Sequence, residues 1–296
     1  MTLSARLLAW YRQFGRDLPW RHTRRAYPIL VSEIMLQQTQ VSRGLIFYPR
    51  FLKRFPSWDA LAKAKNADVI EAWAGLGYNR RALMLRDIAK QVVERGHTPK
   101  NAAEWQTLKG IGPYTSAALA CFSLNERVLP IDTNIRRVLG RVLLGSPFPQ
   151  PEQDAAIQKK SDRIFPKVDF QDIPQAIFDL ATTICTKSPH CAQCPLKNEC
   201  PCASGFLAET YKIPKQMVKK ANETKHRNKP YPDRIYRGRI LKYARENKSV
   251  KVDSKLGKAI DLDFIAKEDL IWLKNMIERL VKDGLLKTEN GMIQVG

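Results

Sequence analysis

The sequence has 296 residues, of which 44% are hydrophobic and 27% are charged. This balance is typical of a folded globular protein and excludes a disordered or fibrous chain. Fifty Lys and Arg residues against 29 Asp and Glu residues give a formal net charge of +21, which predicts a polyanionic partner. No signal peptide and no apolar run long enough to span a bilayer is visible. We therefore expect a cytoplasmic, nucleoid-associated protein without a membrane partner.

Apolar residues recur at helical spacing over residues 4–141, and nothing in this stretch alternates with period two. The run 85–93 is one example, and Gly96 ends it as a helix C-cap would. A second helical segment, 153–186, leads into a group of cysteines. The pattern predicts a mainly α fold for this part of the chain.

The composition changes after Cys202. The stretch 211–232 is polar and basic, as linkers are. Helical patterns return at 235–244 and 270–283, and a short hairpin with its turn at Asn290-Gly291 follows. We predict a core domain, a basic linker and a small winged-helix-like C-terminal domain, with the boundaries 1–204, 205–232 and 233–296.

Two glycines one residue apart, Gly110 and Gly112, lie between helical patterns in the segment 108–117. Glycine lets such a turn approach a ligand closely. The helix that begins near Pro113 would point its free N–H groups beyond the turn, where a phosphate is a suitable ligand. On these residues alone, a simple helix–helix turn is an equally good interpretation.

Two acidic residues lie next to helical patterns. Asp132 precedes the apolar-periodic segment 133–138, where its simplest role is that of an N-cap. Glu33 lies in the segment 32–40 beside apolar residues, where ordinary helix-start chemistry and core packing account for it equally well. Neither residue indicates chemistry by itself.

The cysteines give the strongest pattern. Four of them have the spacing C-x5-C-x2-C-x5-C, at Cys185, Cys191, Cys194 and Cys200. In a reducing compartment, clustered cysteines bind metal more often than they form disulfides. All-cysteine ligation suits both a [4Fe–4S] cluster and zinc. Zinc ribbons usually have two C-x2-C pairs, which this chain lacks, and Cys202 is a spare thiol.

Taken together and in this order, the motifs over residues 4–202 resemble the helix-hairpin-helix DNA glycosylase superfamily that includes endonuclease III and MutY. The segment 32–40 is most similar to MutY-type adenine glycosylases. The resemblance implies a two-lobed helix-hairpin-helix core with a [4Fe–4S] cluster in the loop 185–200. It also implies a base-excision-repair enzyme that flips out adenine mispaired with 8-oxoguanine or guanine and hydrolyses its N-glycosidic bond.

The resemblance also implies roles for single residues. Asp132 would stabilise the positive charge that develops on the sugar, and Glu33, with a pKa raised by burial, would protonate the adenine. Tyr114 stands where the endonuclease III-like lyases have a catalytic lysine, so Schiff-base chemistry is not expected. We place Asn134 with these three in the catalytic set.

The same resemblance implies a set of DNA contacts. Gln37 or Gln38 would fill the gap that the flipped base leaves in the stack, and Tyr78 would wedge into the duplex. The hairpin would bind the backbone. The predicted DNA-binding residues are thus Gln37, Gln38, Tyr78, Gly110, Gly112 and Thr115. The expected partner is double-stranded DNA with a mismatch, and the protein is expected to be a monomer.

The chain departs from the MutY pattern at several places. Asn79 stands where a second tyrosine is common, Thr133 replaces a common glycine, and the first cysteine interval is one residue short. We expect no Nudix-like domain after the core. Instead, the segment 233–241 resembles the tail of a short, actinobacterial-style group, so strong discrimination of 8-oxoguanine is not expected.

Two other functions remain open from the sequence. The core is shared with thymine and uracil mismatch glycosylases, which Tyr114 fits equally well. A non-catalytic iron–sulfur DNA-binding protein would also suit the basic linker and the winged-helix-like tail. The presence of both Glu33 and Asp132 favours an enzyme.

Overall fold

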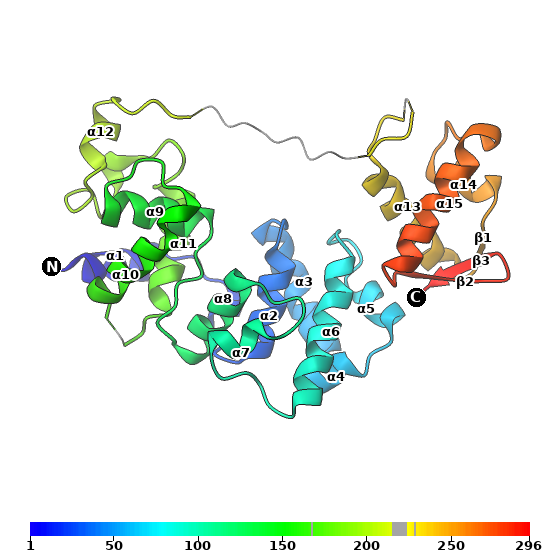
Figure 1. Cartoon of the computed structure of the whole chain (residues 1–296), viewed down its shortest axis with the longest axis horizontal. Helices are drawn as coiled ribbons and strands as arrows, with labels where there is room; N and C mark the ends of the chain where they lie inside the picture. The colour runs from blue at the N-terminus through cyan, green and yellow to red at the C-terminus, as the bar shows by residue number, and fades with distance from the viewer. Residues whose placement is uncertain (167, 215–223, 228) are drawn as a thin grey trace. The chain divides into compact units, whose positions relative to one another are not determined.

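A computed structural model describes residues 1–166, 168–214, 224–227 and 229–296 (Figure 1). The chain divides into two compact units. Unit 1 comprises Met1–Glu33 and His97–Gln216, and unit 2 comprises Ile34–Gly96 and Met217–Gly296. The division between them falls inside one helix, α2 (Ala26–Leu36), directly after Glu33.

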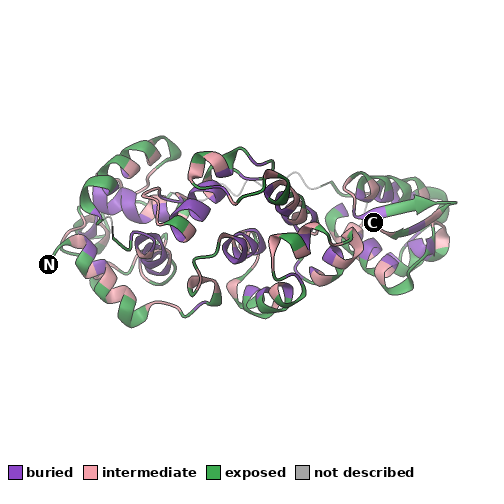
Figure 2. Cartoon of the chain, turned by 90° about the horizontal axis from the view of Figure 1, so that it is seen from below, coloured by how far each residue is buried: buried purple, intermediate pink, exposed green. Residues whose placement is uncertain are grey.

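All regular secondary structure among the described residues of unit 1 is helical. Besides the first part of α2, it contains α1 (Leu3–Phe14), η1 (Pro19–Arg21), α7 (Ala102–Gln106), α8 (Pro113–Leu124), α9 (Thr133–Leu144), η2 (Pro151–Gln153), α10 (Asp154–Ile164), α11 (Asp172–Thr183), η3 (Cys191–Gln193) and α12 (Ala203–Leu207). Helix α9 packs against α10 and α11, α1 packs against α11, and α7 packs against α8. Figure 2 shows that most helices carry both buried and exposed residues, as expected for amphipathic helices.

Helix α8 is the exception to this amphipathic pattern. Every residue from Thr115 to Phe122 is buried, so this helix is surrounded by the rest of its unit, as a helix that is apolar on all sides must be. Pro113 occupies its first turn, and Asn125 ends it in the left-handed conformation. Residue Tyr114 at its N-terminal end is thereby held on a rigid element.

A buried carboxylate ties the N-terminal segment to α11. The side chain of Asp179 is 1% exposed and accepts hydrogen bonds from the Arg16 backbone N–H at 2.8 Å, from Arg16 Nε at 2.6 Å and from both terminal nitrogens of Arg21 at 2.7 and 2.9 Å. Burial alone would raise the pKa of Asp179, but the hydrogen bonds from Arg21 and Arg16 lower it overall. The carboxylate therefore stays ionised in the folded protein.

Unit 2 combines a helical part with the C-terminal segment. Its elements after α2 are α3 (Val41–Arg54), α4 (Trp58–Ala62), α5 (Asn66–Ala72), α6 (Arg80–Arg95), α13 (Asp233–Asn247), β1 (Val250–Lys251), α14 (Ser254–Ile260), α15 (Ala266–Lys282), β2 (Leu286–Glu289) and β3 (Met292–Val295). Among the described residues the strands form one antiparallel sheet in the order β1-β3-β2. The turn between β2 and β3 uses the positive φ angles of Asn290 and Gly291, 49° and 74°, as the sequence predicts.

The mainly α fold expected from the sequence is confirmed, with strands only in the C-terminal segment of the described chain. Part of the predicted linker, residues 215–223 and 228, lies outside the described residues. Its last residues bind the C-terminal segment: Thr224 donates to Asp233 at 2.9 Å, and Lys229 lies 2.6 Å from Asp261 and 2.8 Å from Asp269. The domain boundaries themselves remain a prediction. In the part of the chain that the structure describes, no helix has the length and apolar character to cross a bilayer.

We predict that Asp179→Asn lowers the free energy of unfolding by about 3–5 kcal/mol, because two guanidinium groups then lose the only carboxylate they share in the described structure. The change preserves the shape of the side chain, so it tests charge and not packing. Chemical denaturation at neutral pH measures it. The matched control is Asp87→Asn at an exposed position of α6, and equal effects of the two substitutions would contradict the prediction.

Candidate active site

Glu33 lies one turn before the C-terminal end of α2. Its neighbours Ser32 and Ile34 are both buried, and Glu33 itself is only partly exposed. Burial raises the pKa of Glu33 to about 7, against a hydrogen bond from Tyr114 that lowers it, and the nearby charge of Asp132 raises it further. Near neutral pH, this carboxyl group therefore carries a proton in a large fraction of molecules.

Tyr114, the second residue of α8, connects the two acids. Its hydroxyl group donates a hydrogen bond to the Glu33 carboxylate. Burial raises the pKa of Tyr114 well above its ordinary value, and the negative charges of Glu33 and Asp132 raise it further. The phenol is thus a neutral hydrogen-bond donor between two acids that the sequence places 99 positions apart.

Asp132 is the N-cap of α9. Its Oδ1 accepts hydrogen bonds from the backbone N–H groups of Asn134 and Ile135, both at 2.8 Å, and its Oδ2 accepts one from the Asn134 side-chain amide at 2.7 Å. Three N–H donors and the N-terminus of a helix stabilise an ionised carboxylate. The N-cap role and a position beside Glu33 and Tyr114 are therefore compatible in one residue.

A further arginine fixes the amide of Asn134. Arg137 donates to Asn134 Oδ1 at 3.1 Å and to the carbonyl oxygens of Ala181 at 2.9 Å and Cys185 at 2.8 Å. Because Asn134 accepts from Arg137, its amide nitrogen must face Asp132. The chain of hydrogen bonds thus runs from Asp132 to the backbone of the first clustered cysteine.

The predicted hairpin lies directly before α8. Gly110 has φ +99°, a conformation that L side chains rarely adopt. Gly112 is the N-cap of α8, and a Cβ added there would meet nothing within 4 Å. The hairpin therefore leaves open space beside the N-terminus of a twelve-residue helix, as a phosphate site requires. Thr115, the third predicted contact of this hairpin, is buried.

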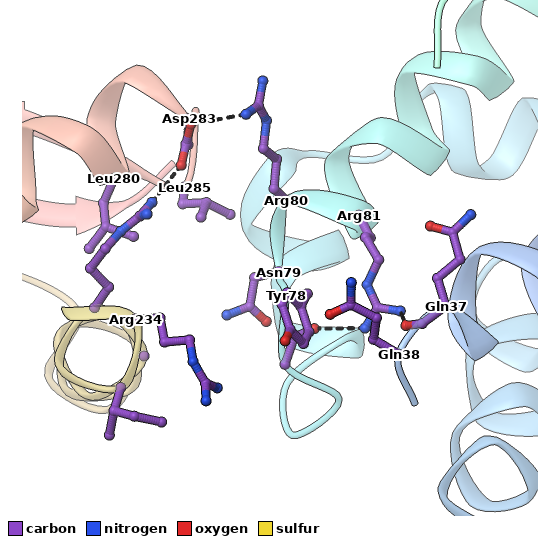
Figure 3. Close-up of a pocket in the computed structure, with 14 residues that line it drawn as sticks. Gln37, Gln38, Tyr78, Asn79, Arg80, Arg81, Arg234, Leu280, Asp283 and Leu285 are labelled. Atoms are coloured by element: carbon purple, nitrogen blue, oxygen red, sulfur yellow. Dashed lines mark hydrogen bonds and ion pairs between the residues drawn. The ribbon is translucent and has the colours of Figure 1, made fainter. Parts of the chain in front are cut away.

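Gln37, Gln38 and Tyr78 belong to unit 2, where they line one groove (Figure 3). Gln38 and Tyr78 both have positive φ angles, 54° and 49°, and the Tyr78 side chain is exposed. Non-glycine residues in this conformation are uncommon and are concentrated at functional sites. The structure thus brings together the three residues expected to contact the base stack.

Arg81 holds the two loops that carry these residues, and the sequence analysis did not identify it. Its guanidinium group lies over the rings of Tyr78 and Trp73, at 5.3 and 5.6 Å from the centroids. It donates hydrogen bonds to Thr39 Oγ1 and to the carbonyl oxygens of Ile34, Met35, Gln37 and Gly77. The carbonyl groups that α2 leaves unpaired at its C-terminus are thereby satisfied.

Cys185, Cys191, Cys194 and Cys200 line one small cavity between α9, α11 and α12, and Cys202 is not among its lining residues. In the described residues, no three His, Cys, Asp or Glu side chains form a group placed to hold a metal ion. Cys185 and Cys202 are buried and the other three are partly exposed. The four thiols thus surround a space and do not converge on a point.

Arg141 supports the loop that carries these cysteines. Arg141 is 2% exposed. Its guanidinium group donates hydrogen bonds to the carbonyl oxygens of Pro147, Thr186 and Lys187 at 3.0, 2.8 and 3.2 Å. The same group lies 3.5 Å from Cys185 Sγ. One buried guanidinium group thus connects helix α9 to the start of the cysteine loop. The signal in the sequence was a basic residue on the apolar face of the helix 133–144, four positions after Arg137.

Comparisons with known proteins identify the family of this chain. The HhH-GPD superfamily base excision DNA repair protein family matches residues 31–167. An adenine DNA glycosylase of Mycolicibacterium smegmatis is 33% identical over 298 residues, which cover 97% of this chain and 94% of that protein. One from Mycobacterium tuberculosis is 40% identical over 201 residues, 64% of each chain, so the match spans about two thirds of that relative.

A solved structure of a thermostable thymine-DNA glycosylase matches with a TM-score of 0.63 and 26% identity, covering 68% of this chain and 94% of that one. An endonuclease III–DNA covalent intermediate matches with a TM-score of 0.57 at 15% identity, which shows the fold alone. The fold and the hairpin define a helix-hairpin-helix base-excision protein. The chain belongs to the HhH-GPD superfamily of base excision DNA repair proteins, in its MutY-type family.

From the raised pKa of Glu33 we predict how the stability of the protein depends on pH, which can be measured without an activity assay. The folded protein holds a proton on Glu33 up to about pH 7, whereas the unfolded chain releases it near pH 4.5, so this residue lowers stability as the pH rises through that window. Glu33→Gln removes the titration and keeps the shape. The variant should gain thermal stability relative to the wild type between pH 5 and pH 8.

The exposed Glu94 of α6 provides the control for this measurement. Thermal midpoints of the wild type, Glu33→Gln and Glu94→Gln at both pH values test the prediction. A difference between Glu33→Gln and the wild type that is the same at pH 5 and pH 8 would contradict it.

Proposed function

We propose that this chain is a monofunctional DNA glycosylase that hydrolyses the N-glycosidic bond of adenine mispaired with 8-oxoguanine or guanine. The observation that carries the proposal is the grouping of Glu33, Tyr114 and Asp132. It joins an acid that keeps its proton near neutral pH to a carboxylate stabilised by three N–H donors. Two carboxyl groups in such different environments are suited to opposite roles in one reaction. The adenine glycosylases among its relatives support adenine as the base.

In this proposal Glu33 is the general acid. Tyr114 donates to one oxygen of its carboxyl group, which leaves the other oxygen to present a proton to the extruded adenine. A protonated purine is a better leaving group, and general-acid assistance of this kind accelerates a reaction by about 10²–10⁴. A pKa of about 7 keeps enough of the acid form at working pH and still allows the proton to leave.

Asp132 acts on the sugar. As the C–N bond breaks, positive charge develops on the deoxyribose, and a carboxylate held in place beforehand stabilises it without reorganisation. The Asn134 amide and two backbone N–H groups fix the orientation of this carboxylate. Water then adds to the sugar carbon. Tyr114 offers no amine for a Schiff base, so the abasic strand is released uncut.

We propose mismatched double-stranded DNA as the partner, bound by a monomer on the nucleoid. The excess of 21 positive charges supports a polyanionic partner, and the open N-terminus of α8 next to Gly112 supports a phosphate contact there. Glu33, Tyr114 and Asp132 all come from one chain and one unit. The site needs no second copy to complete it.

We propose a [4Fe–4S] cluster held by Cys185, Cys191, Cys194 and Cys200. The residues fit this group in two respects: the four thiols line one cavity, and the buried Arg141 offers a positive charge beside Cys185. Cysteines that surround a space suit a multi-iron cluster better than a single zinc ion, whose ligands meet at one point. When bound, the cluster supplies iron–thiolate bonds that fix this loop, and no step of the hydrolysis uses it.

The first prediction of this proposal concerns the two acids. In single-turnover assays with adenine opposite 8-oxoguanine and opposite guanine, Glu33→Gln should lower the rate by about 10²–10⁴. Asp132→Asn should abolish excision and retain duplex binding. The wild-type rate should fall as the pH rises above about 7, because the acid form of Glu33 is lost. Asp87→Asn is the control.

Product analysis completes that test. The wild-type product should be an abasic strand that breaks only after alkali treatment, and borohydride should trap no covalent complex. Faster release of thymine opposite guanine would assign the chain to the thymine-specific glycosylases. Duplex binding without excision of any base would indicate a non-catalytic DNA-binding protein.

The second prediction concerns the cofactor. Protein purified without oxygen should contain about four iron atoms per chain and absorb broadly in the visible range. Cys200→Ser should lose iron, whereas Cys202→Ser should retain it, because Cys202 does not line the cavity. Stoichiometric zinc in place of iron, or equal loss in the two variants, would overturn the assignment.

A further inference from the structure

A groove of about 630 Å³ in unit 2 is lined by two parts of the chain that are far apart in sequence. One wall consists of the loops that carry Gln37, Gln38 and Tyr78 together with the start of α6. The other wall comes from α13 and from the end of α15 in the C-terminal segment (Figure 3). The predicted roles in the core use only the first wall, so the second wall has no role yet.

The groove is rich in positive charge. Four arginines line it, Arg80, Arg81, Arg234 and Arg237, against one carboxylate, Asp283. Arg81 is occupied by the loop carbonyl groups. Arg80 and Arg237 both pair with the one carboxylate, Arg80 at 3.7 Å and Arg237 through a direct hydrogen bond. The lining therefore keeps a net positive charge that is exposed to solvent.

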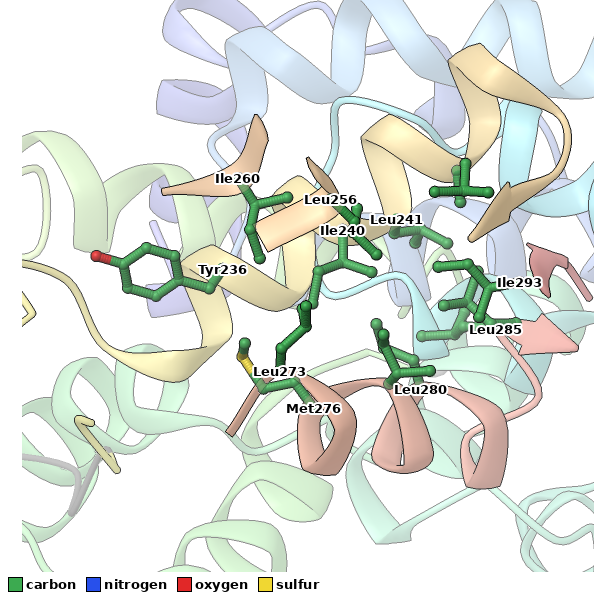
Figure 4. Close-up of a cluster of buried hydrophobic side chains, with 14 of the residues drawn as sticks. Tyr236, Ile240, Leu241, Leu256, Ile260, Leu273, Met276, Leu280, Leu285 and Ile293 are labelled. Atoms are coloured by element: carbon green, nitrogen blue, oxygen red, sulfur yellow. The ribbon is translucent and has the colours of Figure 1, made fainter. Parts of the chain in front are cut away.

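The second wall is held firmly against the core helices of unit 2. Ile70 of α5 and Leu83 of α6 belong to the same buried cluster as the apolar side chains of α13, α14 and α15, which Figure 4 shows in close-up. Gly284, with φ +70°, brings its backbone against Leu83, and a Cβ added there would lie 3.5 Å from that side chain. Apolar packing of this kind holds α13 against α5 and α6, so both walls of the groove belong to one packed unit.

The composition of the groove fits a phosphodiester backbone. Guanidinium groups bind phosphates through paired hydrogen bonds, and an exposed tyrosine with two amide side chains suits contacts with bases and sugars. Arg234 lies in the first turn of α13, is exposed, and extends from that helix toward the Tyr78 loop (Figure 3). A small-molecule site would be more enclosed than this open groove.

We propose that this groove binds the backbone of the DNA strand opposite the extruded nucleotide, with Arg234 and Arg237 of α13 and Arg80 of α6 as phosphate ligands. The assignment of the strand rests on the proposed function. If Gln37, Gln38 and Tyr78 fill the gap left in the stack, the surface beyond them meets the strand opposite the extruded nucleotide. The C-terminal segment is then part of the DNA-binding surface.

Substitutions in α13 test the charge of the groove. Arg234→Ala should reduce the slope of log affinity against log salt for a mismatched duplex by about 0.9, the value for one lost phosphate contact. The control is Lys274→Ala at an exposed position of α15 outside the groove lining, which should leave affinity and slope unchanged. Equal slopes for Arg234→Ala and Lys274→Ala would overturn the proposal.

Gly238 offers a second pair of variants that does not depend on Arg234. A Cβ added at this exposed, groove-lining glycine of α13 would meet nothing within 4 Å, so alanine fits there, and glutamate starts from the same open space. Gly238→Glu should weaken duplex binding, whereas Gly238→Ala should not. Thermal melting of both variants confirms that they fold. Equal affinities for the two would again overturn the proposal.

The strand is identified with neutral methylphosphonate linkages placed singly in either strand of the duplex. A linkage in the opposite strand should weaken wild-type binding and should have no further effect on Arg234→Ala, because the contact is already lost. Coupling only to the adenine-containing strand, or none, would refute the assignment. Wild-type protein that binds with this pattern and releases no adenine would refute the proposed function and leave the groove assignment standing.

Discussion

The hydrogen bond from Tyr114 to Glu33 is the interaction on which the rest of the site depends. It is made among apolar side chains, where an isolated carboxylate is unfavourable. The acid consequently keeps its proton to about pH 7, whereas the second acid, Asp132, accepts hydrogen bonds from three N–H donors at the start of a helix. The burial of α8 serves this arrangement, because it fixes the tyrosine that joins the two acids.

Much of the fold and part of the site follow from local patterns in the sequence. Helical periodicity, the glycines of the hairpin and the Asn290-Gly291 turn each depend on a few neighbouring residues, and the structure has helices and turns there. The sequence pattern also singled out Glu33 and Asp132. Only the resemblance to a family, however, suggested that they act together, because nothing local brings residues so distant into one site. Their catalytic roles remain predictions.

The arginines show what local patterns cannot reveal. Arg81, Arg137 and Arg141 each hold several backbone carbonyl groups from other segments. In the sequence they are three of fifty basic residues. The residues next to a buried arginine in the sequence do not distinguish it from an exposed one. Their roles depend on which loops the fold brings next to a helix. A basic residue on an otherwise apolar helical face, as at position 141, is the one hint that the sequence offers.

The packing of Ile70 and Leu83 against the C-terminal segment has a consequence for how the chain is organised. A module joined only by a linker can be removed without harm, but here deletion would uncover apolar side chains of α5 and α6. A truncated chain would expose an apolar surface prone to aggregation and would lose part of its hydrophobic core. The C-terminal segment therefore shares one buried apolar cluster with these two helices, and its removal would affect the stability of both.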